Sequence, residues 1–425
     1  MSDPVVEPTV ETELADLLKL EASVASGRTR NDATNTTAGG DEPVIRIVNT
    51  FLRDAANARA SDVHLRLVDG ELTVRYRVDG RARQAHVFRG PVAEKILRRI
   101  KILGDVSTTD VRKPLVGQFQ LDVAGHIVDV RVSTIPLFGG EKIVLRLLER
   151  YEISRSLDDL GMDDVTLARY RALCDTSWGV ILVVGPTGAG KTVTTYATLE
   201  EIAGPSQVVA TIEDPVEKVI PRFDQTQVDH ENGIDFAEGL RTVLRQDPNI
   251  IMVGEIRDEE TAGTAIAAAL SGHPVVATTH AIDAAAAILA LRERGVKGNR
   301  ISSALAGIVA QRLVGRICDG CRTDYEPDER DLEYYRALGG TTTQFTHGAG
   351  CVECGHTGYY ERIGVYEVLV MTPTMRALVN VDADHDELLG CALREDMRTM
   401  AQAGCDLVTQ GITTIEEIRK QVHTL

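Results

Sequence analysis

A glycine-rich octapeptide near the middle of the chain has the residue types that bind a nucleoside triphosphate. It is Gly185-Pro186-Thr187-Gly188-Ala189-Gly190-Lys191-Thr192, with the spacing of a Walker A motif. An apolar run, residues 180–184, precedes it and a helical pattern follows it. Glycines let backbone N–H groups surround phosphate oxygens, and the start of a helix favours an anion. We expect Lys191 to reach the β- and γ-phosphates of ATP, and the Thr192 hydroxyl to ligate Mg²⁺.

Three further apolar runs are each followed by acids or a histidine. The runs and the residues after them are 208–212 with Glu213 and Glu217, 250–253 with Glu255, and 274–278 with His280. Ligands of open α/β sheets bind outside the carboxyl ends of the strands, so these side chains should converge on the γ-phosphate. We expect Glu255 to hold Mg²⁺ or its water shell, Glu213 to polarise the attacking water, and His280 to sense the γ-phosphate. The roles of Glu213 and Glu255 are interchangeable on this evidence.

Two Cys-x-x-Cys pairs indicate a metal site. They are Cys318 with Cys321 and Cys351 with Cys354, separated by 29 residues. Four thiolates at such spacing predict a closed tetrahedral Zn²⁺ site with a structural role. A pair of redox-active dithiols is the alternative, disfavoured in a reducing cytosol.

Hydrophobic periodicity divides the chain into segments of different character. Short, largely apolar runs alternating with helical stretches predict a parallel sheet buried on both faces. The segment before them alternates apolar and polar residues around Asp69-Gly70, a hairpin signal, which predicts a small α+β domain. The predicted segments are 1–42, a flexible acidic tail; 43–150, the N-terminal α+β domain; 151–177, a connector; 178–317, a P-loop ATPase domain; 318–357, a tetracysteine zinc region; and 358–425, a C-terminal helical region.

The balance of charges argues against a large nucleic-acid surface. The chain has 46 basic and 63 acidic residues among 425, a net charge of −17. Phosphate backbones are bound chiefly by Lys and Arg, and aromatic residues that could stack on bases make up only 4%. The sequence has no apolar run long enough to cross a bilayer and no apolar signal-peptide segment. We therefore expect a cytoplasmic protein with no nucleic-acid partner and no direct membrane insertion.

Motifs over roughly residues 43–425 resemble the hexameric ATPases of type II secretion and type IV pilus assembly. They are Thr211–Glu217, Gly239–Asp258, Ser271–His280, Ser61–His64, Tyr76–Gly80 and Asp129–Pro136. The resemblance implies a RecA-like ATPase domain preceded by a PAS-like α+β domain, with a zinc-binding C-terminal insertion and a helical C-terminus. It also places Glu213, Asp214 and Glu217 in the family's Asp box, Glu255 in its Walker B motif and His280 in its His box.

The same resemblance assigns arginines to the nucleotide. The matching positions are Arg131, Arg146, Arg241, Arg245 and Arg257. A guanidinium can stabilise charge on the transferring phosphoryl group, and some of these residues would come from a neighbouring subunit. A plainer alternative is that Arg131 and Arg146 only occupy exposed strand faces.

By this likeness the protein is a homohexamer that hydrolyses ATP to move its first domain against the P-loop domain. The implied partners are an inner-membrane platform protein and a recruiting membrane protein, with attachment to the inner membrane only through them. The tetracysteine motif favours pilus assembly over retraction. About forty mostly polar residues take the place of the docking domain that many members carry, so we expect a different recruitment route. A DNA-translocating ring ATPase and a nucleotide-gated scaffold are the alternatives.

Overall fold

The structure, a computed structural model, describes residues 42–123, 125–149 and 156–422. The chain divides into two compact units, Met1–Glu152 and Ile153–Leu425. Each unit has its own main sheet and hydrophobic core. The predicted acidic tail lies outside the described residues as far as residue 41, and Glu42 already begins the first described helix.

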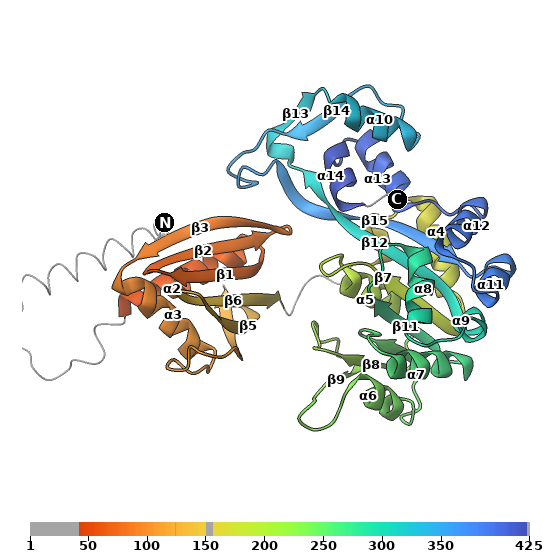
Figure 1. Cartoon of the computed structure of the whole chain (residues 1–425), viewed down its shortest axis with the longest axis horizontal. Helices are drawn as coiled ribbons and strands as arrows, with labels where there is room; N and C mark the ends of the chain where they lie inside the picture. Colours follow the sequence, from red (N-terminus) through yellow and green to blue (C-terminus); the bar gives the residue numbers. More distant parts are fainter. Residues whose placement is uncertain (1–41, 124, 150–155, 423–425) are drawn as a thin grey trace, which may run out of the picture. The chain divides into compact units, whose positions relative to one another are not determined.

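The first unit is an antiparallel six-stranded sheet with two helices (Figure 1), in the order β3-β2-β1-β6-β5-β4. Its elements are α2 (Glu42–Asn57), β1 (Ala60–Val68), β2 (Glu71–Val78), β3 (Arg81–Arg89), α3 (Pro91–Leu103), β4 (Leu115–Val123), β5 (His126–Leu137) and β6 (Gly140–Glu149). The α+β character predicted for this segment is confirmed. The sequence did not predict β3, because only Phe88 of this arginine-rich strand is buried.

Alternation along the strands decides which face of this sheet the helices cover. Leu72, Val74 and Tyr76 of β2 are buried in a core that also contains side chains of α2 and α3. Successive strand residues point to opposite faces, so Arg75 and Arg77 lie on the other face. One face of the sheet is therefore apolar and covered, and the other is polar and rich in arginine.

The second unit contains a seven-stranded sheet in the order β15-β12-β7-β11-β10-β8-β9. The four apolar runs predicted from the sequence form β7, β8, β10 and β11, and their predicted parallel pairing is confirmed. The elements up to its centre are η1 (Leu157–Leu160), α4 (Asp164–Cys174), β7 (Gly179–Val184), α5 (Lys191–Ile202), β8 (Val209–Glu213), β9 (Phe223–Gln227), α6 (Phe236–Val243), β10 (Ile250–Val253), α7 (Glu259–Leu270), β11 (Pro274–Thr279), α8 (Ala284–Glu293) and α9 (Gly298–Ala304).

Helices cover both faces of this sheet (Figure 1). Val180, Leu182 and Val184 of β7 pack into the core with α6–α9, whereas Ile181 packs with α4 and α5. This burial on both sides explains why β7 and β10 are apolar at every position. The segment predicted as a connector joins this core from Leu157 onward.

Three strands that the sequence did not predict complete the sheet. They are β9, parallel to β8, β12 (Leu305–Ile317), parallel to β7, and β15 (Tyr359–Val370), antiparallel to β12. The antiparallel pairing joins segments separated by a whole lobe, so no local pattern could reveal it. The C-terminal region is therefore not only helical, because it begins with a strand of the main sheet before α11 (Pro373–Asn380), α12 (His385–Arg394), α13 (Met400–Thr409) and α14 (Ile415–Gln421).

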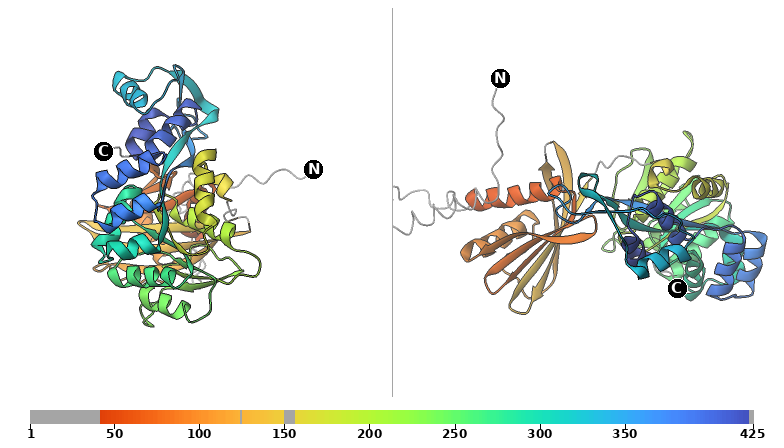
Figure 2. Two further views of the ribbon diagram at one scale, coloured as in Figure 1. Left: turned by 90° about the vertical axis from the view of Figure 1, so that its right-hand side faces the viewer. Right: turned by 90° about the horizontal axis from the view of Figure 1, so that it is seen from above.

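A small lobe lies between β12 and β15. It consists of η2 (Asp319–Cys321), β13 (Arg322–Tyr325), α10 (Glu329–Ala337) and β14 (Phe345–Gly348). The strands β13 and β14 pair with each other in a separate two-stranded sheet. The lobe projects from one end of the second unit (Figure 1, Figure 2).

Candidate nucleotide site and metal centre

The glycine-rich loop connects β7 to α5 at the carboxyl edge of the sheet. Gly185 has a φ of 156° and packs so tightly that an added Cβ would lie 2.6 Å from the carbonyl oxygen of Gln311. Gly190, directly before α5, has a φ of 85°, in the left-handed region that favours glycine. These positions explain why the loop needs glycine, and they leave its N–H groups at a helix start, where phosphate binds well.

The backbone of the glycine-rich loop holds the side chain of Lys191. Its Nζ donates to the carbonyl oxygens of Gly185 at 2.8 Å and Pro186 at 3.2 Å. Burial lowers the pKa of Lys191, and the charge of Glu255 opposes that effect. The ammonium therefore lies against the loop expected to hold the phosphates.

His280 and Glu255 meet beside Lys191. His280 Nε2 lies 2.8 Å from Glu255 Oε1, and its Nδ1 lies 3.1 Å from the Gly185 carbonyl oxygen and 3.4 Å from Lys191 Nζ. Arg257 donates from Nε to Glu255 Oε2 at 2.6 Å and from Nη1 to Asp214 Oδ2 at 3.2 Å. The ends of β7, β8, β10 and β11 thus contribute to one polar chain at the mouth of the P-loop.

Glu213 lies in a separate hydrogen-bond cluster. Its side chain is buried and accepts from the Tyr196 hydroxyl, from Thr211 Oγ1 at 2.6 Å and from Gln225 Nε2 at 3.0 Å. Burial, followed by the charge of Glu213, raises the pKa of Tyr196. The sequence analysis missed both Tyr196 and Gln225, because their contact with Glu213 depends on how α5 and β9 pack beside β8.

The remaining predicted residues of the second unit lie nearer its surface. Glu217 is exposed, and its charge acts to raise the pKa of Lys191. Arg241 pairs with Glu238 at 3.0 Å and with Glu260 at 2.6 Å. Arg245 donates to Thr242 Oγ1 at 3.1 Å. The polar partners of both arginines thus come from α6 and α7. Arg257, by contrast, contacts Glu255 itself, and we call Glu255, His280 and Lys191 the Glu255 cluster.

Arg131 and Arg146 belong to the first unit. They are directly opposite each other on β5 and β6, on the face of the sheet that the helices do not cover. Arg146 Nε donates to Asp62 Oδ1 at 3.2 Å. The two arginines are therefore neighbours on one face of the sheet.

The four predicted cysteines cluster, as expected. Their Sγ atoms lie within 4.8 Å of one another, with 3.8 Å between Cys318 and Cys351, between Cys321 and Cys354, and between Cys351 and Cys354. Four sulfurs at about 2.3 Å from a tetrahedral Zn²⁺ would be about 3.8 Å apart. The Gly358 N–H donates to Cys354 Sγ at 3.3 Å, a contact that supports a thiolate. The thiols therefore fit a zinc ion.

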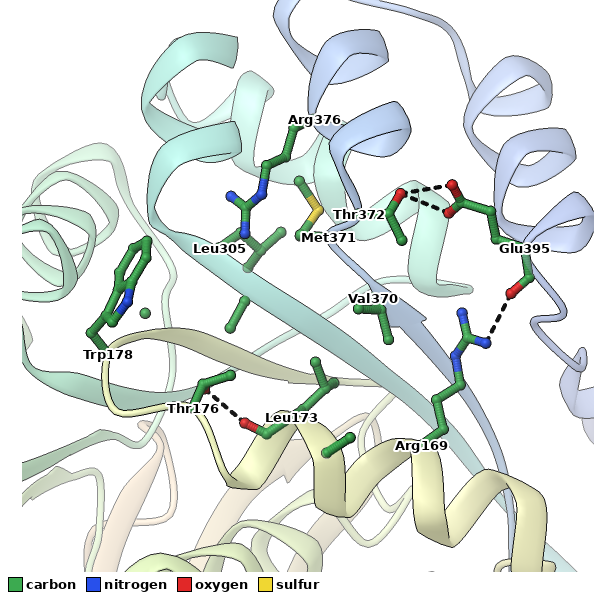
Figure 3. A pocket seen from close by; sticks show the side chains of 13 residues that line it. Arg169, Leu173, Thr176, Trp178, Leu305, Val370, Met371, Thr372, Arg376 and Glu395 are labelled. Atoms are coloured by element: carbon green, nitrogen blue, oxygen red, sulfur yellow. Dashed lines mark hydrogen bonds between the residues drawn. The ribbon is translucent and has the colours of Figure 1, made fainter.

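A largely apolar cavity of about 410 Å³ lies at the amino ends of the strands, where β7 and β12 begin (Figure 3). Trp178, Leu305 and Met371 line it. At its rim, Arg376 donates to the Ser302 carbonyl oxygen and Arg169 donates to that of Glu395. The cavity and the P-loop therefore lie at opposite ends of β7.

Comparisons with known proteins agree with these features. A family model described as a type II/IV secretion system protein matches residues 37–420. The type II secretion system ATPase E of Vibrio cholerae is 37% identical over 89% of this chain and 75% of that protein. The type IV pilus assembly ATPase PilB of Thermus thermophilus is 37% identical over 95% of this chain and 46% of that protein. A crystal structure of the pilus retraction motor PilT with bound ADP is 26% identical, with a TM-score of 0.59 over 88% of this chain and 96% of that one.

Proposed function

This chain belongs to the family of type II/IV secretion system proteins, and we propose that it is a motor that hydrolyses Mg-ATP to assemble a pilus or pseudopilus. The observation that carries the proposal is the meeting of Lys191, His280 and Glu255 at the P-loop. A cation and a carboxylate at one phosphate-binding loop are groups that phosphoryl transfer uses, and the His280 ring joins them there. The 37% identity to PilB supports a role in assembly.

Each side chain of this cluster has a proposed role. Lys191 moves from the loop carbonyls to the β- and γ-phosphates, and His280 senses the γ-phosphate from the end of β11. Thr192 and Glu255 would hold Mg²⁺, which when bound neutralises charge between the phosphates. Glu213, oriented by its three donors, polarises the attacking water, with Glu217 at the entrance. This division assigns the metal to Glu255 and the water to Glu213.

The proposed role of the arginines is to stabilise the negative charge of the transition state. Arg257 already contacts the Glu255 cluster, whereas Arg131 and Arg146 would approach the phosphates from the first unit of this or a neighbouring subunit. Arg241 and Arg245 would face the neighbouring subunit, because their present partners lie on the outer helices α6 and α7. Such sharing requires a ring, for which we propose a homohexamer.

The remaining parts of the chain have proposed roles in transmitting the motion that ATP hydrolysis drives. The order of strands in the first unit and its one covered face support a PAS-like domain. Its proposed role is to move against the RecA-like domain when ATP is hydrolysed. The tetracysteine lobe would bind one structural Zn²⁺ and stiffen the connection between β12 and β15.

Attachment to the inner membrane would be peripheral, through a platform protein and a recruiting membrane protein, with the motor itself in the cytoplasm. Among the described helices of residues 42–422, none is both long enough and apolar enough to cross a bilayer. The proposal therefore places all membrane contact in the partners.

The test is phosphate release by the purified chain. We expect Mg²⁺-dependent ATP hydrolysis by a ring-sized particle, measured by phosphate release and light scattering. A nucleotide-gated scaffold would bind ATP without releasing phosphate. A DNA translocase would show salt-sensitive DNA binding and DNA-stimulated turnover. Either result would contradict the proposed motor.

A further inference from the structure

A buried arginine on β12 contacts both sides of the candidate nucleotide site. We propose that Arg312 is a positioning residue for ATP hydrolysis, which holds the turn that carries His280 against the P-loop. The inference rests on the proposed ATP hydrolysis and adds a residue that the sequence analysis did not single out.

Arg312 lies beside the start of the P-loop. Ala310 of β12 pairs with Val184, the last residue of β7, so Gln311 and Arg312 continue alongside the glycine-rich loop. An added Cβ on Gly185 would be 3.5 Å from Arg312 Nη1. Only 6% of Arg312 is exposed, so its guanidinium must find acceptors inside the protein.

Those acceptors are two backbone carbonyl oxygens. Arg312 donates from Nη2 to the Ile282 carbonyl at 2.6 Å and from Nη1 to the Gln311 carbonyl at 2.9 Å. The side chain of Gln311 in turn donates to the Ala189 carbonyl in the P-loop at 2.6 Å. Two consecutive residues of β12 therefore hold the P-loop and the turn after β11 together.

The turn held by Arg312 carries His280. It spans residues 280–283, between the end of β11 and the start of α8. Its far end is anchored separately, because His385 Nε2 contacts Asp283 Oδ2 at 2.9 Å and the Ala284 N–H donates to Glu367 Oε1 at 2.7 Å. Arg312 holds the middle of the turn, two residues from His280. Without that bond His280 would lose its fixed distance to Glu255.

Arg312 also contributes charge to the site. Among the influences on Lys191, burial lowers its pKa most, Glu255 raises it, and Arg312 lowers it again. A change at Arg312 can therefore act through charge or through the geometry of the turn. Lysine keeps the charge but cannot form the two hydrogen bonds of a planar guanidinium, so Arg312→Lys isolates the geometric effect.

The first experiment compares Arg312→Lys with the wild type. We expect kcat for ATP hydrolysis to fall about 10- to 100-fold, because small displacements of reacting groups cost that much. Mg-ADP affinity, measured by calorimetry, should change by less than about threefold, since the phosphate loop and Lys191 remain. Arg376→Lys is the matched control, because Arg376 also donates to a backbone carbonyl but at the opposite edge of the sheet (Figure 3). It should keep wild-type kcat.

A double-mutant cycle with His280→Ala separates positioning from general damage. If Arg312 acts through His280, adding Arg312→Lys to His280→Ala should lower kcat by less than about threefold further. Losses that multiply in full would overturn the proposal, as would wild-type kcat in Arg312→Lys. Thermal melts accompany each variant, and an Arg312→Lys chain that does not fold would make Arg312 a structural residue and also overturn it. A wild type that releases no phosphate would instead defeat the proposed function.

Discussion

The tetracysteine lobe and the nucleotide site assemble their side chains over very different lengths of chain. All four thiols come from residues 318–354, in two turns beside β13 and β14, and their Sγ atoms lie within 4.8 Å of one another. The nucleotide site collects Lys191 from the start of α5, Glu255 and His280 from the turns after β10 and β11, and Arg312 from within β12.

The difference teaches what each site requires. A metal cluster of four thiols needs two turns with the correct spacing, so it is local and closed. The nucleotide site needs the whole parallel sheet to bring strand ends together, and in our proposal it also needs arginines from the first unit. Substitutions at the carboxyl ends of the strands should therefore stop ATP hydrolysis. Substitutions in the tetracysteine lobe should instead lower the stability of the fold first.

The largest effect is expected from Lys191→Ala. Removing the ammonium at the P-loop should lower ATP hydrolysis by about 10³-fold or more and should weaken nucleotide binding, because the phosphates lose their main cation. Phosphate release and Mg-ADP titration measure both effects. Lys420→Ala is a matched control, because Lys420 lies on α14 and pairs with Glu416 of the same helix, so its loss should leave both unchanged.

Glu255→Gln should separate binding from turnover. The amide keeps the size of the side chain but loses the charge proposed to hold Mg²⁺, so kcat should fall about 10²- to 10³-fold while ATP still binds. Hydrolysis near the wild-type rate would remove Glu255 from the site.

Glu213→Gln provides the contrast. The new amide N–H₂ group would face hydroxyl and amide donors that now all point at a carboxylate. We expect a lower melting temperature as well as lower kcat, whereas Glu255→Gln should melt like the wild type. Equal melting of both variants would contradict the separate clusters described for the two acids.

Arg131→Ala and Arg146→Ala should lower hydrolysis by about 10²-fold while the chain still folds, because each removes a donor proposed to act in the transition state. Rings mixed from Arg146→Ala and Glu255→Gln subunits should regain activity if the arginine acts across the subunit boundary. Equal inactivity of mixed and unmixed rings would place the arginine and the P-loop in the same subunit, and a fully active monomer would exclude sharing altogether.

The cysteine lobe should show the reverse pattern. Purified protein should contain about one zinc ion per chain by metal analysis. Cys318→Ser should lose the metal and make residues 318–358 more sensitive to protease, with hydrolysis reduced less than about tenfold because these thiols lie outside the P-loop cluster. A disulfide in place of zinc would favour the redox alternative.

The smallest effect is a pH dependence at the turn after His280. Burial alone would lower the pKa of His385, but its hydrogen bond to Asp283 raises it above its ordinary value overall. A raised pKa in the folded state stabilises the protein below about pH 6.5, and this contribution is lost as the pH rises through the folded pKa. His385→Gln should therefore lower the melting temperature more at pH 6 than at pH 9. His126→Gln, at an exposed strand start, is the control, and an equal loss at both values would contradict the charged pair.

The sequence by itself determined the features whose signals are local. The apolar pattern was enough for the four central parallel strands, because a strand buried on both faces is largely apolar. Spacing was enough for the P-loop, whose backbone N–H groups lie within a few residues of one another, and for the cysteine cluster, because each Cys-x-x-Cys pair supplies two metal ligands from one turn. The acids after the strands could be named because chain direction places the carboxyl ends of parallel strands at one edge.

Only the tertiary structure decided how these residues are grouped. It joined Glu255 to His280 and Lys191 but enclosed Glu213 with Tyr196 and Gln225. It also added β15 to the sheet and brought Arg312 to the His280 turn. These contacts link segments far apart in the chain, and their formation depends on side-chain packing across strands. That packing leaves no repeating pattern within any one segment, so no period or spacing could have predicted it.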